Sequence, residues 1–190
     1  MADHGDIEPI TGKYVHVDIE GSDHRVYFEE AGPEDGTPLL CQHTAGNNWQ
    51  EWRHLLTDEE ITDEYRVIAH DLPFHGKSVP PTSEAWWEQD YTMTAKRFTE
   101  TLVGLVDALD LEDPIYMGSS MGGNITLELA DWYPDTFQAL IGLECGARSP
   151  GFYIDWLDHP QVNTTEVNAY ACWGLMAPQS PEQPKRETMY

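Results

Sequence analysis

Hydrophobic residues alternate with polar ones near the start of the chain. Val15, Val17 and Ile19 are separated by residues that carry polar groups, and a period of two is expected when one face of a strand is buried. A Gly-Ser pair at 21–22 is typical of a turn, and residues 24–30 form the next candidate strand. The pattern therefore predicts an antiparallel hairpin.

Four later hydrophobic runs lack this alternation. They cover residues 39–41, 67–69, 115–117 and 139–143. Short, continuously hydrophobic runs are typical of strands that are buried on both faces of a parallel sheet. We therefore expect all four runs to form buried parallel strands.

Helical periodicity separates these runs. The most regular hydrophobic stripe consists of Phe98, Leu102, Leu105, Val106 and Leu109, a spacing that places all of them on one helix face. Shorter stripes predict helices at 49–56 and 125–132, the second ended by a proline. Strands that alternate with helices favour right-handed crossovers, so we expect a doubly wound, mostly parallel α/β sheet.

The character of the sequence changes near residue 150. After that point aromatic residues are dispersed among Pro, Asn and Thr without a strand pattern. We predict a core at 1–149 and the beginning of a cap or lid at 150–190. The sheet then looks incomplete on its C-terminal side. Three explanations stay open: a fragment, a chain cut inside the cap with its other half in a separate polypeptide, and a truly reduced variant.

Composition narrows the range of partners. Asp and Glu number 34 against 10 Lys and Arg, which gives a formal net charge of −24. Repulsion from phosphates disfavours nucleic acid and anionic membrane surfaces as partners. No apolar run approaches the roughly 20 residues of a spanning helix, and the first residues lack the features of a secretory signal. We therefore expect a soluble cytoplasmic protein.

Ser120 is the strongest candidate for chemistry. It is the central residue of the motif Gly118-Ser119-Ser120-Met121-Gly122, which lies between the run 115–117 and the helix 125–132. A sharp strand-to-helix turn strains the backbone of the central serine and exposes its hydroxyl at the carboxyl edge of the sheet. Ser119 has the wrong spacing for this role, and the motif lacks the ending of a phosphate-binding P-loop.

With this motif the chain resembles the α/β-hydrolase fold superfamily over roughly residues 14–150. Two more segments carry the resemblance. His43-Thr44-Ala45-Gly46 resembles the family's His-Gly oxyanion loop, with Thr44 in place of the usual glycine, and residues 71–78 resemble a structural turn after the next strand. The resemblance implies that the backbone N–H groups of Ala45 and Met121 hold an oxyanion, and that His43 and His75 are scaffold residues.

The predicted oxyanion and substrate-binding set is Ala45, Met121, Thr44, His43 and Trp49. Trp49 has two interpretations, because it either lines the substrate pocket or opens the helix at 49–56 and packs.

The resemblance implies a serine, an acid and a histidine in that chain order. Glu144 directly follows the run 139–143 and is the candidate acid, the alternative being a solvated loop residue. The histidine is expected outside this chain segment, either in the continuation of a longer chain or in a complementing C-terminal polypeptide. Asp155, Asp158 and His159 cluster beside a proline, as in a turn, so we predict neither a metal site nor a cofactor.

The resemblance also narrows the reaction. Family members that open epoxides or remove halides use a carboxylate nucleophile, whereas this chain has Ser120. We therefore expect a serine hydrolase that cleaves carboxylic esters, or related acyl or carbon–carbon bonds, of a small-molecule substrate through an acyl-enzyme. The alternative is a non-catalytic binding or receptor protein on the same fold with an incomplete triad.

The acidic composition generates a prediction about salt. The chain has few lysines, namely Lys13, Lys77, Lys96 and Lys185. This low number favours the hypothesis that the protein is adapted to high salt. Counterions screen the repulsion among surface carboxylates, so we expect Tm to rise when KCl increases from about 0.1 M to about 3 M. Thermal melting over this range is the measurement, and a Tm that stays constant or falls would contradict the hypothesis.

Overall fold

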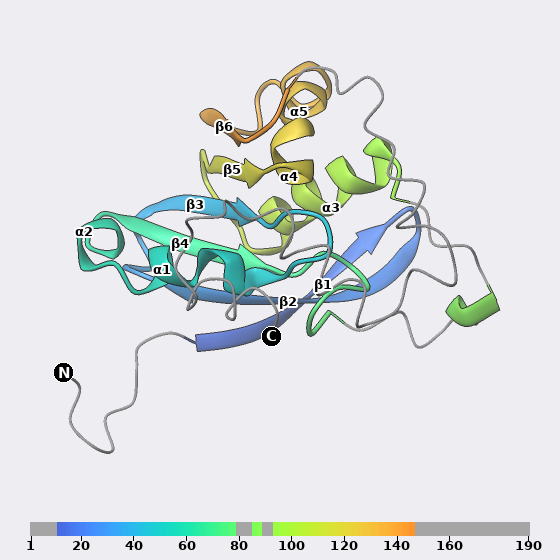
Figure 1. Ribbon diagram of the computed structural model, residues 1–190, viewed down its shortest axis with the longest axis horizontal. Helices are drawn as coiled ribbons and strands as arrows, with labels where there is room; N and C mark the ends of the chain where they lie inside the picture. Colours follow the sequence, from blue (N-terminus) through green and yellow to red (C-terminus); the bar gives the residue numbers. More distant parts are fainter. Residues whose placement is uncertain (1–10, 79–84, 89–92, 147–190) are drawn as a thin grey trace, which may run out of the picture. The chain divides into compact units, whose positions relative to one another are not determined.

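The computed structural model describes residues 11–78, 85–88 and 93–146, and the strands of these ranges form one sheet (Figure 1). The strands are β1 (Thr11–Ile19), β2 (Ser22–Ala31), β3 (Thr37–Gln42), β4 (Tyr65–His70), β5 (Ile115–Ser119) and β6 (Ala139–Leu143). Their order across the sheet is β1-β2-β4-β3-β5-β6. β1 and β2 are antiparallel to their neighbours, whereas β4, β3, β5 and β6 are parallel to one another.

The predicted hairpin is formed by β1 and β2, but its turn lies one residue earlier than the Gly-Ser pair. Ile19 pairs with Ser22 across the loop, and the loop residues Glu20 and Gly21 have φ values of 54° and 84°. Two-residue hairpin loops favour positive φ at both positions because their twist then matches that of the strands. Ser22 is therefore the first residue of β2.

Helices connect the parallel strands, as the alternating pattern predicts. η1 (Trp49–Trp52), α1 (Arg53–Leu56) and α2 (Glu59–Thr62) lie between β3 and β4; η2 (Trp86–Glu88) and α3 (Ala95–Ala108) lie between β4 and β5; α4 (Met121–Asn124) and α5 (Thr126–Trp132) lie between β5 and β6. The helix expected at 49–56 is therefore a 3-10 turn followed by a short α-helix. None of the helices in the described ranges has the length and apolarity that a bilayer crossing needs.

Successive residues of the central strands pack on opposite faces of the sheet. Leu40, Ile68 and Tyr116 belong to the hydrophobic cluster that includes the buried side chains of α3 and α5. Cys41 and Val67 belong to a second cluster, with residues of η1 and α1. Because helices cover both faces, the doubly wound, mostly parallel sheet that the sequence predicts is confirmed.

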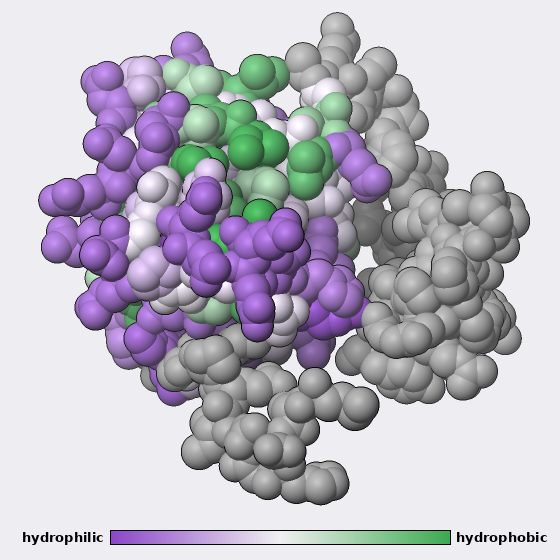
Figure 2. Space-filling model, turned by 90° about the vertical axis from the view of Figure 1, so that its left-hand side faces the viewer, coloured by the Kyte–Doolittle hydropathy of each residue, from purple (hydrophilic) through white to green (hydrophobic). Residues whose placement is uncertain are grey.

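β6 departs from the expectation of strands buried on both faces. Within the described residues it pairs with β5 along one edge, and Ile141 and Leu143 are 39% and 38% exposed. Figure 2 shows hydrophobic residues gathered on the upper part of one face, at the height of β5 and β6 in Figure 1, among hydrophilic neighbours. The expectation was wrong for this run, because burial depends on the neighbours of a strand and not only on its own residues.

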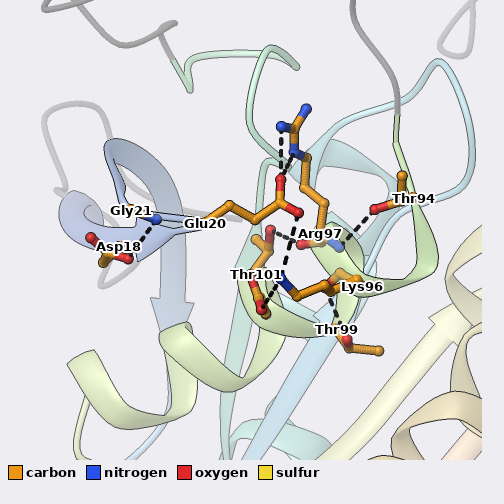
Figure 3. Close-up of polar contacts among 9 residues, drawn as sticks. Asp18, Glu20, Gly21, Thr94, Lys96, Arg97, Thr99 and Thr101 are labelled. Carbon is orange, nitrogen blue, oxygen red and sulfur yellow. Dashed lines mark hydrogen bonds and ion pairs between the residues drawn. The ribbon is translucent and has the colours of Figure 1, made fainter.

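Polar contacts attach the start of α3 to the β1–β2 turn (Figure 3). The Glu20 carboxylate accepts hydrogen bonds from Arg97 Nε at 2.9 Å and from Arg97 Nη2 at 2.8 Å, and Thr94 Oγ1 accepts one from Arg97 N at 3.1 Å. The Glu20 and Arg97 side chains are each 31% exposed, and pairs of this kind contribute about 1 kcal/mol or less. Burial of the hydrophobic stripe of α3 is therefore the larger contribution.

The predicted cap at 150–190 lies outside the described residues, and so does His159. The boundary between residues 149 and 150 stays a prediction.

The packing of α3 generates a stability prediction. Leu102 is 0% exposed within the cluster that joins α3 to the sheet. Leu102→Ala is expected to lower the free energy of unfolding by about 2–5 kcal/mol, because it removes buried methyl groups and leaves a cavity. Leu127→Ala, at a 52% exposed position of α5, is the matched control and should change it by no more than about 0.5 kcal/mol. Urea unfolding measures both; equal effects would contradict the packing described here.

Candidate active site

Ser120 lies in a strained turn between β5 and α4. Its φ is 50° and its ψ is −107°, a backbone region that costs a non-glycine residue about 1–3 kcal/mol. Ser120 N–H donates to the Leu143 carbonyl at 2.8 Å, and its own carbonyl accepts from Asn124 N–H at 2.8 Å. Its side chain makes no capping hydrogen bond to α4. The strained residue is thus held through its backbone, while the hydroxyl is not used by the helix.

The two glycines of the motif are explained by close approach. A Cβ at Gly118 would collide with the Gly122 carbonyl, because α4 folds back directly over the end of β5. A Cβ at Gly122 would lie 2.7 Å from Gln42 Cγ. Tyr116 Oη, which is buried, donates to the Gly122 carbonyl at 2.7 Å. The turn therefore needs glycine on both sides of the serine.

The loop after β3 and the turn after β5 begin at the same edge of the sheet. Gln42 pairs with Gly118 in the parallel register, so the segments that follow them leave the sheet side by side. Met121 is the first residue of α4, and N–H groups at the first turn of a helix have no partner inside it. Among the described residues no acceptor binds Ala45 N–H, and Ala45 is exposed. Both predicted oxyanion donors therefore lie at this edge.

The imidazole of His43 ties the loop after β3 to the turn after β4. The ring is buried; Nδ1 lies 2.7 Å from the Thr44 carbonyl, and Leu72 N–H donates to Nε2 at 3.1 Å. This network assigns the ring proton to Nδ1. Burial lowers the His43 pKa to about 4, with a further lowering from His75. Both nitrogens are occupied, so the side chain holds the scaffold, although the predicted substrate-binding set contains it.

Glu51 is a site residue that sequence reasoning missed. Its Oε2 accepts hydrogen bonds from Thr44 N–H at 2.8 Å and from Asn47 Nδ2 at 3.1 Å, and the Ser119 side chain also interacts with the carboxylate and favours its charged form. Burial raises the Glu51 pKa, the hydrogen bonds oppose this, and the charge of Glu144 adds to the rise. Glu51 is one of 34 acidic residues, and no motif in the sequence distinguishes it from the others.

Asp71 anchors the other end of the oxyanion loop. Its carboxylate accepts hydrogen bonds from Trp49 N–H and from Lys77 N–H, both at 2.7 Å, and burial raises its pKa. The Trp49 ring lies 6.3 Å from the Tyr27 ring and 5.2 Å from Lys77 Nζ. Trp49 therefore opens η1 and packs toward β2, which favours the second of its two interpretations.

Glu144 follows β6 at the edge where Ser120 lies. It has a φ of 50°, it is exposed, and its neighbour Leu143 binds Ser120 N–H. Its charge acts on Glu51, so the two carboxylates are neighbours. The structure thus brings Ser120, Glu144 and the loop 43–46 to one edge. Within the described ranges, no cluster of His, Cys, Asp and Glu is suited to hold a metal ion.

Known proteins resemble this chain in sequence. The family model described as alpha/beta hydrolase fold matches residues 37–163, more than half of the chain. Epoxide hydrolase 4 of Mus musculus is 31% identical over 135 residues, which cover 70% of this chain and 35% of that protein. The 2-hydroxy-6-oxononadienedioate/2-hydroxy-6-oxononatrienedioate hydrolase of Paraburkholderia phymatum is 28% identical over 152 residues, which cover 77% of this chain and 49% of that protein. The chain spans half or less of the length of these relatives.

A solved structure has the same fold. The thermophilic esterase from Thermogutta terrifontis superposes with a TM-score of 0.61 at 24% identity, over 92% of this chain and 57% of the esterase. At this identity the likeness shows the fold alone.

The buried imidazole of His43 generates a pH prediction. Its pKa falls from 6.5 to about 4 in the folded protein, so the unfolded chain binds the proton more readily, and stability is lost as pH falls through this window. Between pH ~7.5 and ~5 we expect His43 to account for a loss of about 2 kcal/mol in the free energy of unfolding. Urea unfolding at both pH values should show a smaller loss for His43→Gln than for wild type.

The exposed His54 provides the control for this pH dependence. His54→Gln should keep the wild-type loss. An equal loss in wild type and His43→Gln would show that His43 is not the titrating group.

Proposed function

Because the chain belongs to the alpha/beta hydrolase fold family, we propose that it acts as a serine hydrolase that cleaves a carboxylic ester, or a related acyl or carbon–carbon bond, of a small molecule. The observation that carries this proposal is the strained backbone of Ser120, with φ 50° and ψ −107°, in a turn between β5 and α4 in which its hydroxyl does not cap the helix. Strain of this kind is kept where a side chain must point away from its own helix.

Ser120 is the proposed nucleophile. A base takes the hydroxyl proton while Ser120 Oγ attacks the carbonyl carbon, and the resulting tetrahedral intermediate collapses to an acyl-enzyme as the protonated alcohol leaves. Water then attacks the acyl group by the same route, which releases the acid and restores the serine.

The oxyanion is stabilised by two backbone donors in this proposal, Ala45 N–H and Met121 N–H. Their common position at the carboxyl edge of the sheet supports the assignment. Loss of one such donor typically costs about 3–4 kcal/mol of transition-state stabilisation. Both are main-chain groups, so their positions depend on how the two segments are held.

We assign the role of acid to Glu144 and expect the base to be a histidine from outside the described residues. Two buried histidines at this edge are poor candidates. Both nitrogens of His43 are occupied. His70 is fully buried, and burial together with His43 lowers its pKa to about 3. A serine needs a base that is accessible and titrates nearer neutrality.

The site chemistry favours uncharged acyl substrates. The similar protein from Mus musculus is named an epoxide hydrolase, but the serine at position 120 favours acyl transfer over chemistry that uses a carboxylate nucleophile. Glu51 and Glu144 place negative charge beside the turn, and this charge repels a substrate with several carboxylates. We place the reaction in the cytoplasm, where free thiols such as that of Cys41 stay reduced.

A binding protein on the hydrolase fold is the second candidate. It is favoured by the engagement of both His43 nitrogens in the scaffold. Covalent chemistry at Ser120 separates the two candidates, because a binding protein has no activated hydroxyl.

Replacement of Ser120 tests the proposed function. The wild-type protein is purified from its own source, so that any polypeptide that accompanies it is kept. A fluorophosphonate probe should label this wild-type protein. Hydrolysis of p-nitrophenyl esters should show a burst, because acylation precedes deacylation. Ser120→Ala should remove both signals and reduce kcat/KM by at least about 1000-fold.

Thr57→Ala, which removes an exposed hydroxyl at the end of α1, is the control and should keep both signals. Full activity in Ser120→Ala would exclude the proposed nucleophile. Wild-type protein that is neither labelled nor active would favour the binding protein.

A further inference from the structure

A single carboxylate joins the two segments that carry the proposed oxyanion donors. Glu51 Oε2 lies 2.8 Å from Thr44 N, directly before Ala45. The Ser119 side chain interacts with the same carboxylate and favours its charged form, and Ser119 precedes the nucleophile and Met121. Within the described residues, β3 and β5 are joined through backbone pairing only as far as Gln42 and Gly118. Beyond the sheet, Glu51 therefore links the two segments.

The start of η1, the 3-10 helix that contains Glu51, is held by hydrogen bonds. The Trp49 N–H is bound by Asp71 at 2.7 Å and the Gln50 N–H is capped by Asn48 Oδ1 at 2.9 Å. Asn47 Nδ2 contributes a further hydrogen bond to Glu51 Oε2 at 3.1 Å. Because η1 is held in this way, its Glu51 carboxylate can fix the loop before η1 and the turn after β5 relative to this helix.

We propose that Glu51 is a positioning residue that sets the spacing between Ala45 N–H and Met121 N–H, and so the fit of the oxyanion site to its transition state. The inference rests on the proposed function, because it assigns these two groups as donors. It goes further in identifying what holds them: a side chain whose hydrogen bonds go to the loop after β3. An error of about 1 Å in such a site costs up to about 100-fold in rate.

The bridge requires the ionised form of Glu51. A carboxylate only accepts hydrogen bonds, and it offers enough lone pairs for all its partners; the protonated acid must itself donate from one oxygen. Glu144 is the charged neighbour that acts on Glu51, and burial raises the Glu51 pKa together with that charge. His43 and Asp71 are the other titratable groups bound to the same loop. As the pH falls, Glu51 should therefore be protonated, and the bridge lost, at a higher pH than the one at which an ordinary glutamate is protonated.

Three variants test the role of Glu51 in ester hydrolysis. Glu51→Gln keeps the shape and one acceptor oxygen, Glu51→Ala removes the bridge, and Gln50→Ala removes an exposed neighbouring side chain of η1 as the control. At pH ~8 we expect kcat to fall about 10-fold in Glu51→Gln and about 100-fold in Glu51→Ala, with KM within about 2-fold of wild type. Gln50→Ala should match wild type.

The pH profile separates positioning from general support of the fold. On the acid side of the profile, the slope of log kcat/KM against pH should be smaller by one in Glu51→Gln than in wild type. The reason is that the variant lacks the carboxyl group that titrates. A wild-type kcat in Glu51→Gln would overturn the inference. So would a kcat loss with an unchanged slope on the acid side, which would show that Glu51 only supports the fold.

A measurement without substrate keeps this inference distinct from the proposed function. In an NMR titration of wild type, the amide signals of Thr44, Ala45 and Met121 should follow the carboxyl signal of Glu51 with one midpoint, and this response should be absent in Glu51→Gln. If the amides follow Glu51 but the protein does not hydrolyse esters, the bridge stands and the proposed function alone fails. Amides that do not follow Glu51 overturn the bridge whatever the kinetics show.

Discussion

The parallel register of the central strands is the constraint on which the site depends. Gln42 pairs with His70 on one side and with Gly118 on the other, and Ser119 pairs with Leu143. Because parallel strands share a direction, their last residues reach the same edge of the sheet. The oxyanion loop, the turn after β4, the turn that contains Ser120, and Glu144 therefore meet there, although they are far apart in the sequence. A slip of one residue would also turn the hydrophobic side chains of a strand to the wrong face, so the core that sets the register also sets the site.

Beyond the edge, the loops need hydrogen-bond partners that the sheet no longer supplies. Buried or partly buried backbone N–H groups are costly when they lack acceptors. Here side chains take over: Glu51 binds Thr44 N–H, and Asp71 binds Trp49 N–H and Lys77 N–H. Burial raises the pKa of both carboxyl groups, which is the cost of placing the negative charge where the loops need an acceptor. The loops are thus hydrogen-bonded without being regular, and these hydrogen bonds are made to two ionisable side chains.

Local patterns predicted most of this fold and only part of the site. The period of two in β1, the stripe of α3 and the glycines around Ser120 are local signals, and each was found in the sequence. β6 has the same kind of hydrophobic run as β3, yet it is exposed at Ile141, because burial depends on which elements lie beside a strand. Glu51 was missed for a related reason: it lies in η1, Ser119 lies at the end of β5, and nothing in the residues around Glu51 indicates that the two side chains interact. The sequence predicts which segments form the site, whereas the side chains that hold them together depend on the tertiary structure.

The two adjacent serines of the motif show how the backbone, rather than residue type, selects the proposed nucleophile. Ser119 is the last residue of β5, and in a strand successive side chains point to opposite faces; its side chain interacts with Glu51. Ser120 has left the strand, and its φ of 50° turns its side chain away from the helix that follows. The same change of direction begins α4 at Met121, so the strain that frees the hydroxyl also brings a backbone N–H group to its side. Ser119 has an identical side chain one residue earlier, but that side chain interacts with a carboxylate of the scaffold. A single strained residue therefore determines both the direction of the hydroxyl and the point at which the helix with the proposed oxyanion donor begins.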